Sequence, residues 1–369
     1  MQALVTYADY RSPPAGGCPC GSAYCHPRIV LEDRAVSGLA PGYLRIEIAR
    51  VGICGSDLGV MLTEPGSGRI SSTVPLDIPP AGRIPGHEGV GIVREVGAGV
   101  TGFAPGDWVT LQSLTSCGHC PPCLRGALNQ CLDGRLVGFQ CDGIFAESAD
   151  LPASLARHIG AMADSEQGLR AATCIEPAAC ALVALQASAL RPGANVLIFG
   201  AGPIGVFTAM LCRNLFGAAR VDVVEPVRFR RNFARQWVDN SSDAAPLPED
   251  SGGCRWDLLV EASGALENVD AVMRQLAPNA RVLLLARGTR PLHLAAVGHM
   301  ITNGIAIIGS RGHLGGAFET IIALWGKGQL PLEDAVTGVE TGGLDAVKRA
   351  LESPQAVAEA HCKLQVLLR

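Results

Sequence analysis

Hydrophobic and polar positions alternate with a short period along the first part of the chain. Residues 1–7 and 43–53 place β-branched or aromatic side chains near alternation with polar ones, and residues 89–100 and 106–112 do the same. This period is typical of half-buried β-strands. Residues 8–28 and 62–85 are rich in Pro, Gly and Ser and predict loops. The pattern therefore predicts a β-rich region over about the first 170 residues.

The pattern changes near residue 175. Apolar runs at 195–199, 220–225, 256–263, 281–286 and 304–310 alternate with helical patterns, of which 179–190, 203–216 and 267–276 are the clearest. Short apolar strands alternating with helices indicate a doubly wound parallel sheet, so the fold class is α/β. Two helices and a last strand, 363–369, follow and are expected to pack back on the first domain. The predicted domains are 1–175 with 314–369, and 176–313.

Composition narrows the class of partner. The chain has 369 residues and a net charge of −4, which argues against a nucleic acid or an anionic membrane as the partner. The most apolar stretch, 195–211, is interrupted by four Gly or Pro residues and is too short for a membrane span. Fourteen cysteines without a secretion signal predict a reducing, cytoplasmic compartment.

A glycine motif follows the first strand of the second domain. It has the form G-x-G-x-x-G and consists of Gly200, Ala201, Gly202, Pro203, Ile204 and Gly205. Such a turn lets a backbone approach a pyrophosphate at a helix N-terminus. Glu225 ends the next strand, where a carboxylate would bind ribose hydroxyls and repel a 2′-phosphate, which favours NAD over NADP. The alternative is a solvated Glu225, with a 2′-phosphate gripped by Arg228, Arg230 or Arg231.

Four cysteines with the spacing C-x2-C-x2-C-x7-C lie in one loop: Cys117, Cys120, Cys123 and Cys131. Four thiolates close a tetrahedral zinc site with no open position, so the expected role is structural. An iron–sulfur cluster or free thiols are the alternatives.

Further candidates for chemistry are spread over three segments. "GICGSD" contains Cys54, Ser56 and Asp57, "GHEGVG" contains His87 and Glu88, and "IEPAAC" contains Glu176. Each is weak evidence alone. Together they offer a thiolate, an imidazole and one or two carboxylates, the mixed and open ligand set expected of a catalytic zinc.

With these motifs in order, the chain resembles the zinc-dependent medium-chain dehydrogenases/reductases, the alcohol dehydrogenase superfamily. The Glu of "IEP", where alcohol dehydrogenases proper usually have Cys, makes it similar to the polyol, sugar and threonine dehydrogenase branch. The resemblance implies a GroES-like catalytic domain beside a Rossmann domain, and two zinc ions per chain. The catalytic zinc would be held by Cys54, His87 and Glu88 or Glu176, the two carboxylates sharing or exchanging one position.

The resemblance also implies an activity. A secondary alcohol of a polyol, sugar, cyclitol or amino alcohol would pass hydride to NAD, with Ser56 relaying the proton and Asp57 orienting a ligand. Arg230 and Lys363 are expected near the cofactor, a solvated surface lysine being the alternative for the latter. We expect a homodimer or homotetramer. The alternative functions are a reductase of a biosynthetic ketone using NADPH, and a catalytically silent NAD- or zinc-binding protein.

The substrate is not specified by these motifs. The loop 62–85 is long for the family and is expected to reshape the substrate entrance. Arg311 and His313 are candidates for contact with substrate or cofactor, but solvated loop residues are the favoured interpretation.

An extra cysteine cluster lies near the N-terminus, in an apparent insertion. It comprises Cys18, Cys20, Cys25 and His26. The C-x-C spacing with an intervening Pro is not that of a zinc knuckle. We therefore expect free thiols rather than a third metal site or a redox pair.

Overall fold

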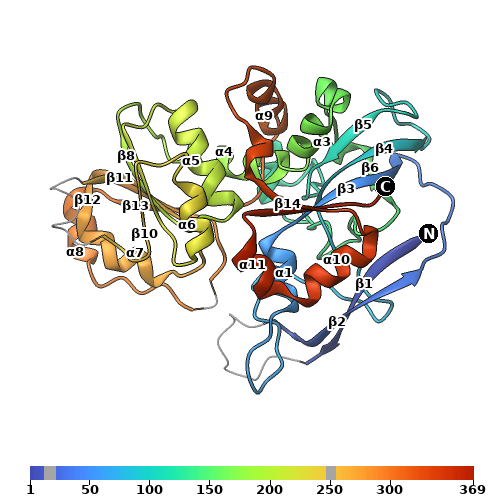
Figure 1. The fold of residues 1–369 in the computed structure, drawn as a ribbon, viewed down its shortest axis with the longest axis horizontal. Helices are drawn as coiled ribbons and strands as arrows, with labels where there is room; N and C mark the ends of the chain where they lie inside the picture. Colours follow the sequence, from blue (N-terminus) through green and yellow to red (C-terminus); the bar gives the residue numbers. More distant parts are fainter. Residues whose placement is uncertain (12–21, 247–254, 289) are drawn as a thin grey trace.

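The computed structural model describes residues 1–11, 22–246, 255–288 and 290–369. Two sheets dominate these residues, one in each half of the molecule (Figure 1). The predicted α/β class is confirmed, with a doubly wound parallel sheet beside a second, mainly antiparallel sheet.

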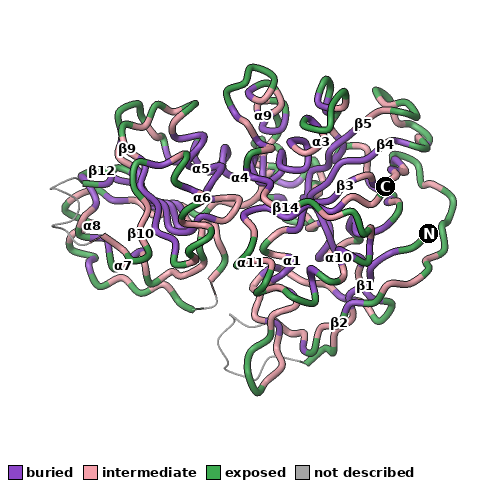
Figure 2. The backbone as a smooth tube through the Cα atoms, in the orientation of Figure 1, coloured by how far each residue is buried: buried purple, intermediate pink, exposed green. Residues whose placement is uncertain are grey.

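The parallel sheet has six strands in the order β10-β9-β8-β11-β12-β13. They are β8 (Asn195–Phe199), β9 (Arg220–Val224), β10 (Asn240–Ser242), β11 (Trp256–Glu261), β12 (Leu276–Leu284) and β13 (Ala306–Gly309). The central strands carry continuous apolar runs because helices cover both faces of such a sheet, and Figure 2 shows them as the buried interior of this half.

The second sheet has the order β14-β15-β3-β4-β5-β7, and β6 also pairs with β3. Its strands are β3 (Tyr43–Ile53), β4 (Glu88–Val96), β5 (Trp108–Leu111), β6 (Ser148–Pro152), β7 (Ala156–His158), β14 (Val336–Glu340) and β15 (Lys363–Leu367). The chain thus returns from the parallel sheet to this one, and β15 lies antiparallel to β3 with Leu364 opposite Ile53.

Helices connect and cover the sheets. They are α1 (Gly55–Met61), α2 (Pro121–Leu124), α3 (Glu166–Ala172), α4 (Ile175–Ala187), α5 (Pro203–Asn214), α6 (Arg228–Ala234), α7 (Glu267–Val272), α8 (Val297–Asn303), α9 (Ala317–Gly326), α10 (Gly343–Glu352) and α11 (Pro354–Ala360). Of the returning segment, α9 packs mainly on α4 and pairs Glu319 with Arg157 of β7, while α10 packs on the N-terminal strands and β15.

The predicted loop over 8–28 is wrong at both ends. β1 (Gln2–Tyr10) continues past residue 8, and β2 (Tyr24–Asp33) begins before residue 28. The two strands form an antiparallel pair, with a register shift between Tyr7 and Asp9. The residues added to the strands, 8–10 and 24–28, contain no Gly and a single Pro, and they pair with each other as strands, so the predicted loop was too wide.

The stretch 195–211 divides into β8 and the first part of α5, with the glycine motif between them. Within the described residues, no single helix is long and apolar enough to cross a membrane; only the bent pair α3 and α4 passes together by length and composition.

Candidate active site and metal centres

Cys54 caps the N-terminus of α1, at the end of the central strand β3. Its backbone N–H donates to Asp57 Oδ2 at 3.1 Å, the return bond of a capping box. The "CGSD" sequence therefore begins the helix, and the same capping contact fixes the position of the Cys54 thiol. Ser56, in the first turn, donates its hydroxyl to Cys54 Sγ at 3.1 Å.

Three donor groups converge at this point. One ligand atom each of Cys54, His87 and Glu88 lies within 4.8 Å of the others. His87 directly precedes β4 and Glu88 is its first residue, and β4 pairs with β3. One sulfur, one nitrogen and one oxygen donor fit a zinc ion that keeps a fourth position for substrate.

Asp57 holds the imidazole of His87. Its Oδ1 lies 3.3 Å from His87 Nδ1, and both side chains are buried. Burial opposes a charge on His87, but Asp57 and Cys54 outweigh it and hold the pKa of the imidazole well above its usual value. With Nδ1 held by a carboxylate, Nε2 is the nitrogen left to bind a metal.

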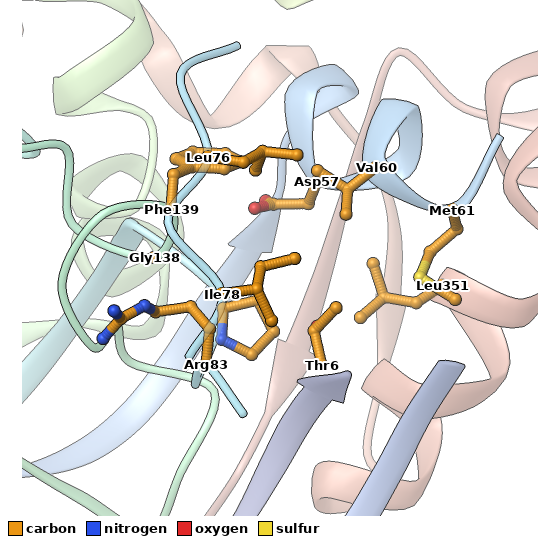
Figure 3. A pocket seen from close by; sticks show the side chains of 11 residues that line it. Thr6, Asp57, Val60, Met61, Leu76, Ile78, Arg83, Gly138, Phe139 and Leu351 are labelled. Atoms are coloured by element: carbon orange, nitrogen blue, oxygen red, sulfur yellow. The ribbon is translucent and has the colours of Figure 1, made fainter. Parts of the chain in front are cut away.

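The Asp57 carboxylate also borders a mainly apolar pocket. Figure 3 shows it pointing from α1 toward the side of the pocket where Phe139 lies, whereas Val60, Met61 and Leu351 line the opposite side. In such surroundings the charge of Asp57 is poorly screened, which strengthens its attraction for His87.

Lys363 is the counter-charge of Glu88. Its ammonium group contacts Glu88 Oε2, and it donates to the backbone carbonyl of Ile53 at 3.1 Å. Burial lowers the pKa of Lys363 to about 8, against the attraction of Cys54 and Asp57. A Cβ on Gly52 would lie 2.7 Å from Lys363 Cε, so only glycine leaves room for this pair.

The side chain of Lys363 has a relative exposure of 0%, so the alternative of a solvated surface lysine is wrong. The pairing of β15 with β3 carries Lys363 inward, over a sequence separation that spacing in the sequence cannot show. Contact of Lys363 with cofactor phosphates stays a prediction.

Glu176 lies outside the three-donor group. Its Oε1 accepts a hydrogen bond from Ser113 Oγ at 2.6 Å and lies 3.6 Å from Cys180 Sγ. Both Glu176 and Cys54 raise the pKa of Cys180, after the larger effect of burial, which puts the two residues near one thiol. The structure therefore favours Glu88 as the carboxylate nearer to Cys54 and His87 and leaves Glu176 beside them.

The interpretation of His313 as a solvated loop residue is wrong. His313 is 4% exposed, and its Nε2 accepts the backbone N–H of Ser113 at 3.0 Å and lies 3.9 Å from Glu176 Oε1. Burial lowers the pKa of His313, so the ring is neutral at neutral pH. Sequence reasoning missed Ser113 entirely. Its only signal is a polar residue two positions after the end of the strand β5.

The four predicted cysteines come together in a small lobe. Cys117, Cys120, Cys123 and Cys131 place their sulfur atoms within 4.8 Å of one another, and His119 is exposed beside them. Backbone N–H groups lower the pKa of Cys120 to about 6, whereas burial raises that of Cys123 to about 12. Four sulfurs around one point fit a closed zinc site.

Each glycine of the motif has a separate task. Gly200 has φ +97°, and a Cβ on Gly205 would lie 1.9 Å from the carbonyl oxygen of Gly200. In contrast, a Cβ on Gly202 would meet only an Arg230 guanidinium nitrogen, at 3.8 Å. The backbone at Gly202 is therefore open to a ligand, as a cofactor pyrophosphate requires.

Glu225 lies directly against this loop. Its carboxylate accepts the N–H of Ala201 at 2.8 Å and that of Val227 at 2.9 Å. Arg230 donates to the carbonyl of His361, and Arg231 donates to the carbonyls of Glu225 and Pro226. The Glu225 carboxylate is thus fixed where the ribose hydroxyls are expected. Arg231 stabilises the backbone of the loop after β9 rather than facing the cofactor site.

Of the N-terminal cluster, Cys18 and Cys20 lie outside the described residues. Cys25 is fully buried in β2, whereas His26 is half exposed and lies 3.2 Å from Asp9. The two side chains therefore have different surroundings, and Cys25 belongs to none of the possible metal clusters of the described residues.

Comparisons with known proteins agree with this arrangement. Residues 40–160 match the model of the alcohol dehydrogenase GroES-like domain. L-threonine 3-dehydrogenase of Pyrococcus furiosus is 31% identical over 326 residues, which cover 86% of this chain and 89% of that protein. The chain belongs to the zinc-dependent medium-chain alcohol dehydrogenase family.

A further relative and a solved structure agree with this. The 2-dehydro-3-deoxy-L-galactonate 5-dehydrogenase of Pseudoalteromonas atlantica is 29% identical over 322 residues, 84% of this chain and 87% of that protein. A solved structure from Thermotoga maritima, provisionally assigned as an alcohol dehydrogenase, has the same fold, with a TM-score of 0.87 and 24% identity over 99% of both chains. The predicted polyol and threonine dehydrogenase-like branch is confirmed, and the chain is an NAD(P)-dependent oxidoreductase of the alcohol dehydrogenase type.

Proposed function

We propose that this alcohol dehydrogenase oxidises a secondary alcohol of a polyol, sugar, cyclitol or amino alcohol, with NAD as the hydride acceptor. The main support for the proposal is the convergence of Cys54, His87 and Glu88. In the same chain the backbone at Gly202 is open to a cofactor pyrophosphate. The relatives named above act on L-threonine and on 2-dehydro-3-deoxy-L-galactonate, which supports a polar substrate with a secondary alcohol or the corresponding ketone.

The chain's own residues have defined tasks in this proposal. Cys54, His87 and Glu88 would hold a zinc ion, which supplies a Lewis acid that polarises the substrate oxygen. Asp57 keeps His87 in the tautomer that presents Nε2. Ser56, whose hydroxyl lies at the thiol, would accept the proton of the substrate hydroxyl and release its own proton to water or to the cofactor ribose.

The second half of the molecule would bind the cofactor. The loop at Gly202 takes the pyrophosphate, and Glu225 takes the adenosine ribose hydroxyls. Glu225 is the reason to favour NAD, because its buried carboxylate would repel a 2′-phosphate. Arg230, whose guanidinium lies beside Gly202, would contact the phosphates of either cofactor.

Four finer points belong to the same proposal. We infer two zinc ions per chain, one in each cysteine-containing cluster. We also keep the domain division 1–175 with 314–369 and 176–313, and a homodimer or homotetramer. The eleven described cysteines are all free thiols, which supports a reducing, cytoplasmic compartment.

The test is a substrate screen with a metal analysis. Purified protein is assayed for NAD and NADP reduction on polyols, cyclitols, amino alcohols and hydroxy acids, and its zinc content is measured. We expect NAD reduction with at least one class and about two zinc ions per chain. One zinc ion and no turnover on any class would favour the catalytically silent protein, and preference for NADP would overturn the cofactor assignment.

A further inference from the structure

Two arginines stand at the carboxyl edge of the parallel sheet. Arg287 follows β12 and Arg311 follows β13, and these strands are parallel neighbours with Leu284 opposite Gly309 (Figure 1). In open α/β sheets ligands bind in the crevice outside the carboxyl ends of the strands. Both residues are therefore placed to meet a bound molecule.

Arg311 has an incomplete set of partners. Its backbone carbonyl is fixed by Asn129 Nδ2 at 2.8 Å, but its Nε is buried and has no hydrogen-bond partner within the described part of the chain. A guanidinium N–H that is buried without an acceptor costs free energy, and an anion would supply the acceptor.

Arg287 is the second cation of the pair. It donates to the backbone carbonyl of Thr73 at 3.4 Å, and neither arginine forms an ion pair with a carboxylate of the described residues. Arg287 is an exposed residue, but partial desolvation of its guanidinium and the nearby positive charge of Arg311 lower its pKa. The two charges therefore repel each other, and no carboxylate of the described residues forms an ion pair with either of them.

The surroundings of the pair connect it to the candidate active site. Thr73 follows Ser72, and a Cβ on Gly59 of α1 would lie 3.5 Å from Ser72 Cβ, so this segment packs on the helix that Cys54 begins. On the other side, His313 follows Arg311 by two residues and contacts Ser113 and Glu176. The arginines thus lie between segments that flank the three donors.

We propose that Arg287 and Arg311 bind an anionic group of the substrate, a carboxylate or a phosphate, so that the enzyme selects anionic secondary alcohols. This inference rests on the proposed function and narrows its substrate class. Arginine suits the task because its planar fork matches the oxygens of either group. The substrates expected are hydroxy acids, sugar acids and sugar phosphates rather than uncharged polyols.

The kinetic test compares matched pairs of alcohols. The zinc-loaded enzyme is assayed with NAD on 3-hydroxybutyrate against butane-1,3-diol, and on galactitol 1-phosphate against galactitol. We expect the anionic member of at least one pair to be preferred. Arg311→Gln and Arg287→Gln should each lower the anionic-to-neutral ratio of kcat/KM by about 10- to 100-fold, and the Lys variants should recover part of it.

Arg290→Gln is the matched control. Arg290 is exposed near the same sheet edge and is paired with Glu267 at 3.0 Å, so its loss should leave the ratio unchanged. Equal kcat/KM for the members of both pairs, or an equal effect of all three variants on the ratio, would overturn the inference.

A binding measurement separates this inference from the proposed function. Inorganic phosphate is titrated calorimetrically into the enzyme already saturated with NAD, so that the pyrophosphate subsite is filled. We expect phosphate to bind and Arg311→Gln to weaken it by about 10-fold. An absence of binding contradicts the anion site even if neutral alcohols are oxidised. Binding without turnover on any alcohol contradicts the proposed function alone.

Discussion

The two sulfur-containing clusters use similar donors in opposite surroundings. In the lobe at 117–131 four thiols face one another, and the acid beside them, Asp133 near Cys117, is exposed. At Cys54 a single thiol is joined by His87 and Glu88, with Asp57 and Lys363 buried behind them. The first set would close around a metal, whereas the second would leave a position open and is supported by charges of the protein itself.

This difference shows that the role of a cysteine depends on the residues that surround it. Cys54 and Cys120 are both N-cap residues of short helices, so local structure does not distinguish them. The lobe gains its order from short-range spacing, whereas the Cys54 cluster is assembled by the pairing of β3 with β4 and β15. Substitutions should therefore separate a loss of turnover from a loss of stability.

The largest effect is expected at the open cluster. Cys54→Ser removes the sulfur donor and should lower kcat/KM by about 10⁴-fold, because a zinc ion that activates the substrate contributes several kcal/mol to the reaction. NAD binding, followed by fluorescence, should persist because Gly202 and Glu225 are untouched. Undiminished turnover in this variant would refute the assignment of the cluster.

Lys363→Met tests the supporting charges. It leaves the buried carboxylate of Glu88 unpaired and should lower the free energy of unfolding by about 3–5 kcal/mol, measured with urea on chelator-treated protein. The double variant Lys363→Met with Glu88→Gln should recover most of that loss. No recovery would mean that Lys363 stabilises the fold by some other contact.

Cys123→Ser tests the closed cluster. It should remove one zinc ion per chain and lower the free energy of unfolding by about 3 kcal/mol, because metal binding is coupled to the order of the lobe. Cys141→Ser is the matched control, since Cys141 is a half-buried free thiol outside both clusters. A similar melting temperature and zinc content in both variants would show that the lobe holds no metal.

Asp57→Asn should have the smallest effect of the four. The amide keeps the shape but loses the charge that orients His87, so zinc affinity at the open cluster should fall by about 10- to 100-fold. The zinc of the lobe should be retained, and competition with a chelator distinguishes the two sites. Loss of both zinc ions at the same chelator concentration would contradict the separation of the clusters.

Local sequence determined a large part of this protein. The glycine turn, the alternation of strands and helices, and the convergence of four cysteines follow from spacings within a few residues, and the structure has each of them where the pattern predicts it. These features are predictable because the backbone between the residues is too short to place them far apart.

Tertiary structure decided what lies between the two sheets. Only the pairing of β15 with β3 brings Lys363 to Glu88, and only the packing of the segment after β13 brings His313 to Ser113. The choice of Glu88 over Glu176 as the neighbour of Cys54 and His87 has the same origin. These contacts join residues that are distant in the sequence, and the register and burial that create them are properties of the folded chain rather than of any one segment.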